Sequence, residues 1–260
     1  ERIGEPLFDR EGRRMVLTAT GQLVQAYAEN IFGLGQEMLG RLQGQAAGIT
    51  RLRVGSVATM SRNYQENWLR PLLADPDVRL TLESGVLEGL IERLLQHQLD
   101  VVLANETVPA HPDRPLHCRF LGSQSISLVG PASRWQSCSL RIPDDLDGLD
   151  LALPGPRHAV RAQFDALCLS AGVAPRLRAE VDDMAMLRLI ARDSGWLTVL
   201  PEVVVQDELR AGVLVTVGQS PELRESFYAI TAPHRHRIDV LEPLLRPSAD
   251  LPAAAHSPPP

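Results

Sequence analysis

The feature that most constrains the fold is a regular alternation of strand-like and helix-like segments between Thr50 and Leu245. Short runs of branched aliphatic residues, which favour strands, are separated by segments in which apolar residues recur every three or four positions, as on one face of a helix. Consecutive βαβ units of this kind form parallel sheets, so the chain is predicted to be an α/β protein. Strands are expected at 52–57, 78–82, 99–104, 125–129, 149–153, 177–181, 196–200, 213–217 and 227–231. Helices are expected at 63–73, 87–95, 160–171, 184–192, 203–209 and 238–245.

The alternation has two halves, joined where the chain leaves the first half along the extended segment Ser125–Val129. Two chain features mark helix ends in the second half. Gly172 is expected to close one helix, because glycine adopts the left-handed conformation without strain. Asp182 or Asp183 is expected to cap the next helix. The tail 247–260, rich in proline, alanine and serine, is expected to be disordered.

Residues 19–45 form a long periodic segment that precedes the alternation. Its apolar stripe predicts a helix, but Gly33, Gly35, Gly40 and Gly44 each weaken that helix by about 1 kcal/mol relative to alanine. Such a helix needs a partner surface, and the pattern leaves open whether this is the chain's own core or another chain. The stripe consists of Val24, Tyr27, Ala28, Ile31, Leu34, Met38 and Leu42. The glycine- and glutamine-rich segment 43–48 is expected to be a hinge.

The segment Glu5–Gly21 contains two short apolar runs on either side of a charged turn that includes a glycine. This pattern predicts a β-hairpin with Arg10, Arg13 and Arg14 at its tip. Thr18 stands where a helix should begin, because its side-chain oxygen can accept one of the first unpaired N–H groups. The three arginines either contact phosphate groups or belong to a solvated turn.

Bulk properties limit the classes of function. The 260 residues carry a net charge of −6 and are 44% hydrophobic, as in an ordinary globular protein. The acidic balance by itself argues against nucleic-acid binding by the body of the chain. No apolar run is long enough to cross a membrane, and no export signal is visible. Three cysteines without close spacing suit reduced thiols in a cytosol, and Cys118 and Cys138 are expected to be buried rather than a redox pair.

Sequence signatures of catalysis and cofactor binding are absent. The chain has no glycine-rich nucleotide motif, zinc-protease motif, CxxC pair or GxSxG elbow. His234 and His236 could ligate a metal, but surface histidines after a strand more often have no such role. We therefore expect no enzyme, no catalytic residue, no cofactor and no metal site.

Three motifs together resemble LysR-type transcriptional regulators. Leu7–Gly21 resembles the signature that ends their winged helix-turn-helix and opens their linker helix, and Leu99–Leu103 and Leu189–Pro201 resemble two segments of their effector-binding region. The resemblance implies a two-lobed domain of the periplasmic-binding-protein type, built from two Rossmann-like subdomains. It also implies that the helix-turn-helix lies before Glu1.

The resemblance supplies domain boundaries. Residues 1–18 would end the winged helix-turn-helix, 19–48 would be the linker helix and hinge, and 49–246 the effector-binding domain. Within that domain, lobe one would comprise about 49–124 and 227–246, and lobe two about 125–226.

The resemblance also implies a function. A small-molecule or ion effector would bind between the lobes and change promoter binding through the linker helix. The protein would be a cytoplasmic homodimer or homotetramer that binds promoter DNA and no membrane, with activation or repression left open. Thr81–Ser84, Leu94–Asp100 and Val181–Leu187 look most like the branch that regulates sodium/proton antiporters. The alternative is a free-standing solute-binding protein, which the hairpin motif opposes.

Candidate effector contacts follow from the strand ends. Parallel α/β sheets bind ligands beyond the carboxyl ends of their strands, and the cleft between two lobes is the default site. The polar residues there, with the crossing strand included, are Thr59, Ser61, Ser84, Asn105, Glu106, Ser127, Arg157, Asp182 and Asp183. Among these, the family resemblance supports Thr59, Ser61 and Arg157.

Each candidate also has a structural explanation. Thr59 and Ser61 either contact the ligand or cap the helix that follows, and capping is favoured for Asp182 and Asp183. Glu106 would otherwise be a solvated loop carboxylate. The effector itself stays open between a cation and an organic anion. Sodium or lithium would need oxygen ligands from Glu83, Glu106, Asp182 and Asp183, if these converge. An anion would bind Arg157 and helix N-termini.

Overall fold

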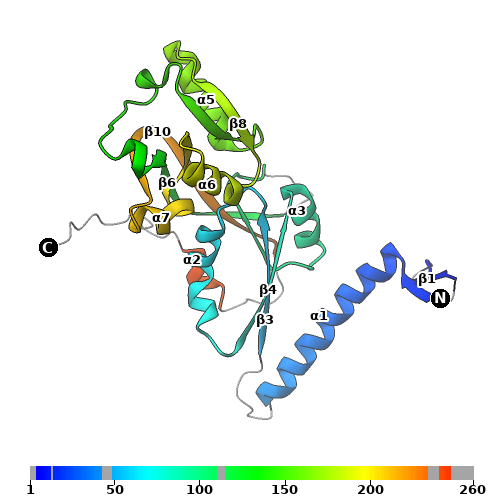
Figure 1. Ribbon diagram of the computed structural model, residues 1–260. Coiled ribbons are helices and arrows are strands. Elements are labelled where there is room, and N and C mark those ends of the chain that lie inside the picture. The colour runs from blue at the N-terminus through cyan, green and yellow to red at the C-terminus, as the bar shows by residue number, and fades with distance from the viewer. Residues whose placement is uncertain (1–3, 13, 43–48, 110–114, 234–239, 247–260) are drawn as a thin grey trace.

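The computed structural model describes residues 4–12, 14–42, 49–109, 115–233 and 240–246. An eight-stranded sheet runs through both halves of the body in the order β4-β3-β5-β10-β6-β9-β7-β8, and a separate two-stranded hairpin precedes it. Figure 1 shows two lobes that share this sheet, with a long helix extending away from them. The expected α/β fold is confirmed. The predicted hinge 43–48 and tail 247–260 lie outside the described residues, as do Arg13, His234 and His236.

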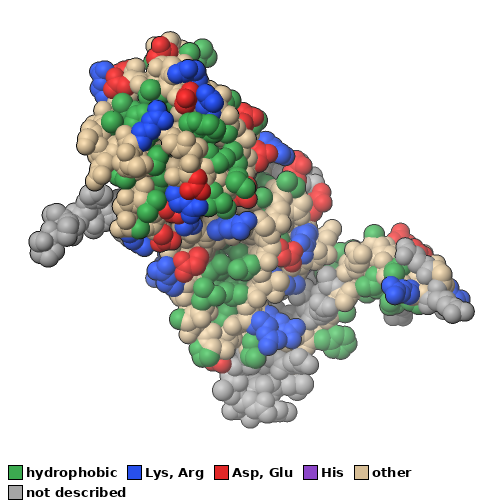
Figure 2. Space-filling view, viewed as in Figure 1, with side chains coloured by type: hydrophobic (Ala, Val, Ile, Leu, Met, Phe, Trp, Pro, Cys, Tyr) green, Lys and Arg blue, Asp and Glu red, His purple; other side chains and the backbone are tan. Residues whose placement is uncertain are grey.

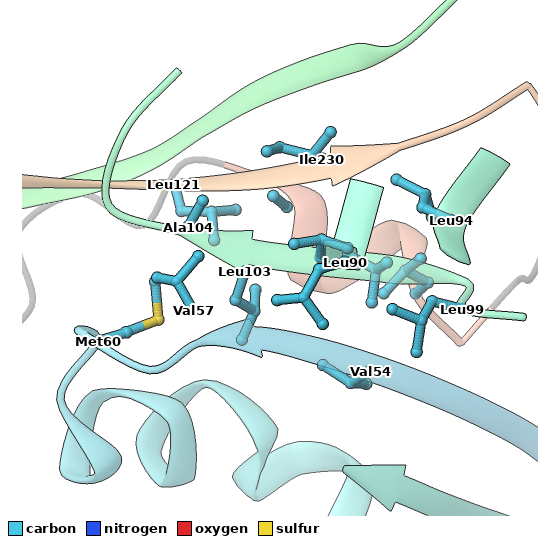
Figure 3. Close-up of a cluster of buried hydrophobic side chains, with 14 of the residues drawn as sticks. Val54, Val57, Met60, Leu90, Leu94, Leu99, Leu103, Ala104, Leu121 and Ile230 are labelled. Carbon is cyan, nitrogen blue, oxygen red and sulfur yellow. The ribbon is translucent and has the colours of Figure 1, made fainter. Parts of the chain in front are cut away.

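Lobe one is built on three parallel strands, as predicted from the alternating pattern. Strand β3 pairs with β4 on one side and with β5 on the other, both in parallel register. Its elements are β3 (Thr50–Val57), α2 (Arg62–Leu73), β4 (Val78–Gly85), α3 (Leu87–Leu95) and β5 (Val101–Ala104). Figure 3 shows the core between them, in which Leu94, Leu99 and Leu103 are fully buried.

Lobe two repeats the arrangement. Strand β7 pairs in parallel with β8 and β9. Its elements are α4 (Ala132–Trp135), η1 (Asp144–Leu146), β7 (Asp150–Pro154), α5 (Ala159–Ala171), β8 (Arg176–Val181), α6 (Met184–Asp193), β9 (Leu197–Pro201), η2 (Glu202–Val205) and α7 (Gln206–Arg210). Gly172 closes α5 with a φ of 68°, and the Asp183 carboxylate caps α6 by accepting the Ala185 N–H at 2.8 Å. Both predicted helix ends are confirmed.

Two long antiparallel strands join the lobes. Strand β6 (His117–Pro131) pairs with β10 (Leu214–Thr231), then with β9 in lobe two, while β10 also pairs with β5 in lobe one. The prediction of two separate strands at 213–217 and 227–231 was wrong. The register of β10 shifts at three places, and these irregularities carry the strand through a glycine- and proline-containing stretch that resembles a loop in sequence.

Two helix predictions also need correction. The segment expected to be a helix at 203–209 is divided between the 3₁₀ turn η2 and the short helix α7. Only a 3₁₀ turn, η3 (Glu242–Leu245), is described where a last helix was expected at 238–245. Pro243 follows the first residue of that turn and has no N–H to donate to a longer helix.

The N-terminal hairpin and helix form as predicted. Strands β1 (Phe8–Glu11) and β2 (Arg14–Leu17) pair antiparallel, and α1 (Ala19–Leu42) follows. The Thr18 hydroxyl accepts the Gly21 N–H at 2.9 Å and donates to the Pro6 carbonyl at 2.7 Å. A side chain at Gly21 would overlap the Leu7 carbonyl oxygen, so glycine is required there for the close approach of hairpin and helix.

Helix α1 carries exposed apolar side chains. Ile31 and Phe32 are 65% and 72% exposed, and Tyr27 makes an edge contact with the His97 ring of lobe one. On the face shown in Figure 2, acidic and basic side chains are interspersed over the two lobes. Among the described residues, no helix combines the length and apolar character needed to span a membrane.

Candidate functional site

A cleft of about 280 Å³ lies where the two lobes meet at strand β10. Lobe one contributes the loop after β5, lobe two contributes α5, and β10 forms the remaining wall. The lining residues are Asn105, Glu106, Thr107, Ala159, Gln163, Arg224, Glu225, Ser226 and Tyr228. The cleft therefore contains polar and charged groups from both lobes.

Glu225 is the most unusual group in this cleft. Glu225 is only 3% exposed. Its carboxylate accepts hydrogen bonds from the side-chain amides of Asn105, at 3.1 Å, and Gln124, at 3.4 Å. Burial raises the pKa of Glu225 to about 7, against the opposing effect of the two amides. Sequence reasoning missed this residue. The available signal was a glutamate between Leu223 and Phe227, at an inward position of an alternating strand.

A chain of hydrogen bonds links Glu225 to the carboxyl end of β3. The Thr59 hydroxyl donates to the Asn105 side-chain oxygen at 3.3 Å, and Asn105 in turn donates to Glu225. Tyr64 of α2 stacks on Phe227 with ring centroids 3.6 Å apart. The pKa of Tyr64 is raised, mainly by burial and to a lesser extent by the negative charge of Glu225. The structure thus places two predicted residues, Thr59 and Asn105, in one hydrogen-bonded chain with Glu225, which the sequence did not indicate.

Ser61 and Ser84 lie elsewhere. Ser61 is buried and caps α2 by accepting the Tyr64 N–H at 3.4 Å. Ser84 lines a smaller cavity of about 110 Å³ inside lobe one, together with Ser56, Gln65 and Glu83. The Glu83 carboxylate pairs with Arg93, with one N–O distance of 2.9 Å. Of the serines predicted in lobe one, neither lines the cleft between the lobes.

The buried Ser127 belongs to a hydrogen-bond network that joins β6 and β10 to η2. Its hydroxyl donates to the Glu202 carboxylate at 2.8 Å, and Gln219 donates to both groups at 3.1 and 2.8 Å. Thr216 donates to the same carboxylate oxygen at 3.0 Å. Nearby, Asn63 of α2 donates to the Val203 carbonyl at 2.8 Å and so connects lobe one with lobe two.

The predicted residues of lobe two form a cluster of their own. Arg157 donates to the Asp182 carboxylate at 3.2 Å, and both side chains are mostly exposed, at 77% and 60%. The Asp183 carboxylate caps α6. The buried His158 ring contacts the Asp182 carbonyl at 2.9 Å.

The four carboxylates considered for a cation do not converge. Glu83 pairs with Arg93, Asp182 pairs with Arg157, Asp183 caps α6, and Glu106 alone lines the cleft. Within the described part of the chain, no three His, Cys, Asp or Glu side chains gather as a metal site.

The cysteine prediction also needs correction. Cys118 and Cys138 are exposed, and Cys168 is buried. Cys118 lies at the start of β6, where residues 117–120 are all exposed, and Cys138 follows the short helix α4. Burial raises the pKa of the Cys168 thiol.

Arg10 and Arg14 are exposed on the hairpin, where Arg10 pairs with Met15 and Arg14 with Glu11 across the two strands. The third predicted arginine, Arg13, lies outside the described residues. The hairpin therefore presents basic side chains to solvent at a distance from the lobes in Figure 1.

Comparison with known proteins agrees with this architecture. The sequence model of the LysR substrate binding domain matches residues 45–246. The chain is 24% identical over 237 residues to the transcriptional activator protein NhaR of Escherichia coli, which covers 89% of this chain and 76% of that protein. Full-length OxyR from Pseudomonas aeruginosa superposes with a TM-score of 0.64 at 21% identity, covering 94% of this chain and 80% of that one. Full-length CbnR in complex with its target DNA gives a TM-score of 0.62 at 18% identity, covering 94% and 86%.

The fold and the cleft define a two-lobed α/β domain of the periplasmic-binding-protein type, preceded by a hairpin and a long helix. The chain belongs to the LysR family of transcriptional regulators, and residues 45–246 form the substrate binding domain of that family.

Proposed function

We propose that the protein regulates transcription in the cytoplasm by binding a small effector in the cleft between its lobes. The observation that supports this proposal is the cleft itself, which is lined by residues of both lobes and of the strand that joins them. A ligand that contacts both walls would favour one relative orientation of the lobes, and it shifts the equilibrium only as far as its affinity differs between the two states.

Within the cleft, we assign direct effector contact to Asn105 and Glu106, with Thr59 positioning the Asn105 amide. Ser61 and Asp183 act as helix caps, and Ser127 helps to join β6 and β10 to η2. Ser84, Arg157 and Asp182 would influence the ligand only through movement of their own lobes. Fewer residues are assigned to effector contact than were expected from the strand ends, because the expected side chains lie in separate clusters.

The signal would pass through α1 to the hairpin. In this proposal residues 1–18 serve as the wing, 19–48 as the linker helix and hinge, and 49–246 as the effector-binding domain. Arg10, Arg13 and Arg14 would contact phosphate groups of promoter DNA, which positions the protein without reading bases. The exposed apolar residues Tyr27, Ile31 and Phe32 of α1 would pair with a second copy in a homodimer or homotetramer.

We further propose a sodium/proton antiporter gene as the regulated target. The support is the resemblance of Thr81–Ser84, Leu94–Asp100 and Val181–Leu187 to the antiporter-regulator branch, together with the overall similarity to NhaR. The proposal concerns the promoter. It does not place sodium in the cleft, because three of the four carboxylates considered for that ion, Glu83, Asp182 and Asp183, are engaged elsewhere.

Promoter occupancy in the host cell tests this function. The protein expressed from its own gene should occupy a small set of promoters, including one for an antiporter, when DNA fragments bound to it are recovered and sequenced. The double substitution Arg10→Ala and Arg14→Ala should reduce occupancy at all sites alike, because phosphate contacts carry no sequence information. The matched control is Arg62→Ala and Arg79→Ala on lobe one. An absence of enriched promoters would contradict the regulator function, whereas enrichment without an antiporter promoter would contradict only the target.

A further inference from the structure

We propose that the ligand of the cleft between the lobes is a small molecule with a protonated amine, and that this ammonium group binds beside the carboxylate of Glu225. The inference rests on the proposed function, in which this cleft holds the effector. It adds the chemical class of that effector and the side chain that selects it.

The Glu225 carboxylate lacks a counter-ion among the described residues. Glu225 is almost fully buried, and both of its hydrogen-bond donors, Asn105 and Gln124, are neutral amides. Within the described residues, no basic side chain forms an ion pair with it. The adjacent Arg224 directs its guanidinium to the Ser123 hydroxyl at 2.8 Å instead. A buried carboxylate without a counter-ion is unfavourable, so a ligand that brings a positive charge relieves the cost.

The surroundings of the Glu225 carboxylate also favour a cationic ligand. Glu106 adds a second carboxylate to the lining, while Ala159 and the ring of Tyr228 add apolar surface. The ionisable groups around Glu225 are Tyr64 from α2, Glu106 from the loop after β5, and Arg224 and Tyr228 from β10. Of these groups only the arginine is cationic. The lining therefore suits an ammonium group attached to a short carbon skeleton.

The size of the cleft and the groups that face Glu225 favour a small organic cation over a metal ion. A cleft of about 280 Å³ is smaller than most sites for drug-sized molecules but far larger than one ion needs, so it fits a molecule of about amino-acid size. A bare metal ion would also need several oxygen ligands. Asn105 and Gln124 instead present N–H groups to Glu225, and the Asn105 oxygen already accepts from Thr59.

Calorimetric titration of the full chain tests the proposal with three compounds of matched carbon skeleton: propylamine, β-alanine and propionate. We expect propylamine and β-alanine to bind with a Kd near the millimolar range, as suits ligands of so few atoms, and propionate not to bind. Glu225→Gln should weaken amine binding by about tenfold or more. Glu222→Gln, an exposed glutamate three residues earlier on β10 that does not line the cleft, should leave it unchanged.

The pH dependence of the unmodified protein gives a second measurement that does not depend on how the variant folds. Propylamine stays protonated between pH 6 and 8, whereas Glu225, with a pKa of about 7, changes from mostly protonated to mostly ionised. Propylamine should therefore bind about tenfold more tightly at pH 8 than at pH 6. Glu225→Gln should remove this dependence.

Three results would overturn the proposal. Propionate binding without amine binding would show an anion site and would leave an effector cleft standing. A heat of binding for sodium chloride, absent for potassium chloride at equal ionic strength, would show a metal ion as the ligand. Failure of both amines to bind at tenfold the expected Kd would remove the amine class altogether, and the promoter-occupancy result would then decide separately whether the regulator function holds.

Discussion

Glu225 makes the stability of the folded protein depend on pH. Its pKa rises from an ordinary value of 4.5 to about 7 on folding, so the folded protein binds this proton more tightly than the unfolded chain does. Between these two pH values the unfolded state binds fewer protons, and stability is lost as the pH rises through this window. The full effect amounts to about 3 kcal/mol.

Replacing the Glu225 carboxyl with an amide should remove its contribution to the pH dependence of stability. When the pH is raised from 5 to 8, the free energy of unfolding of the unmodified protein should fall by about 2.5 kcal/mol more than that of Glu225→Gln. Urea unfolding at four pH values across this range measures the difference, with Glu222→Gln as the control for loss of an exposed carboxylate. Parallel pH curves for Glu225→Gln and the unmodified protein would show that the buried carboxyl does not carry the dependence.

The sequence could not have identified Glu225 by its neighbours. Its two hydrogen-bond donors lie 120 and 101 positions away in the chain, and only the pairing of β10 with β5 and β6 brings them together. Asn105 and Thr59 were predictable because both lie just beyond the carboxyl ends of parallel strands: Asn105 directly follows β5, and Thr59 lies two residues after the end of β3. Arg157 and Asp182 were predictable on the same ground, but their mutual ion pair was not, since a strand end fixes a position and not a side-chain partner.

At the level of elements, local signals predicted most boundaries. Ser61 and Asp183 begin α2 and α6 through side-chain hydrogen bonds, and Gly172 ends α5 in the left-handed conformation. The long strand β10 was not predictable, because bulges let it continue through Gly218 and Pro221. Local propensity indicates a break there, and tertiary pairing with β6 overrides it.

The cap of α6 can be tested directly. Asp183→Ala removes the acceptor for the Ala185 N–H and should cost about 1 kcal/mol in the free energy of unfolding, within a range of about 0.5–2 kcal/mol. Denaturant unfolding at pH 7 measures this, and Asp183→Asn, which keeps a capping oxygen, should recover most of the loss. If alanine and asparagine behave alike, the hydrogen bond does not stabilise the helix.

At the level of the whole molecule, the two lobes are not separate bodies joined by a linker. They share one sheet, and β6 and β10 lie at its centre between β5 and β9. Reorientation of the lobes must therefore twist these two strands. The bulges of β10 and the Ser127–Glu202–Gln219 network lie at that crossing, so movement there would be coupled to whatever occupies the cleft.

A larger side chain in the cleft tests whether an effector binds there. Ala159 lines it from α5, whereas Ala166 is exposed on the same helix and does not line it. Transcription from the occupied promoter would be measured with a reporter across a panel of growth media. We expect Ala159→Phe to make reporter output the same in every medium, and Ala166→Phe to respond as the unmodified protein does. A normal response from Ala159→Phe, with the protein folded and bound to its promoter, would contradict an effector site in this cleft.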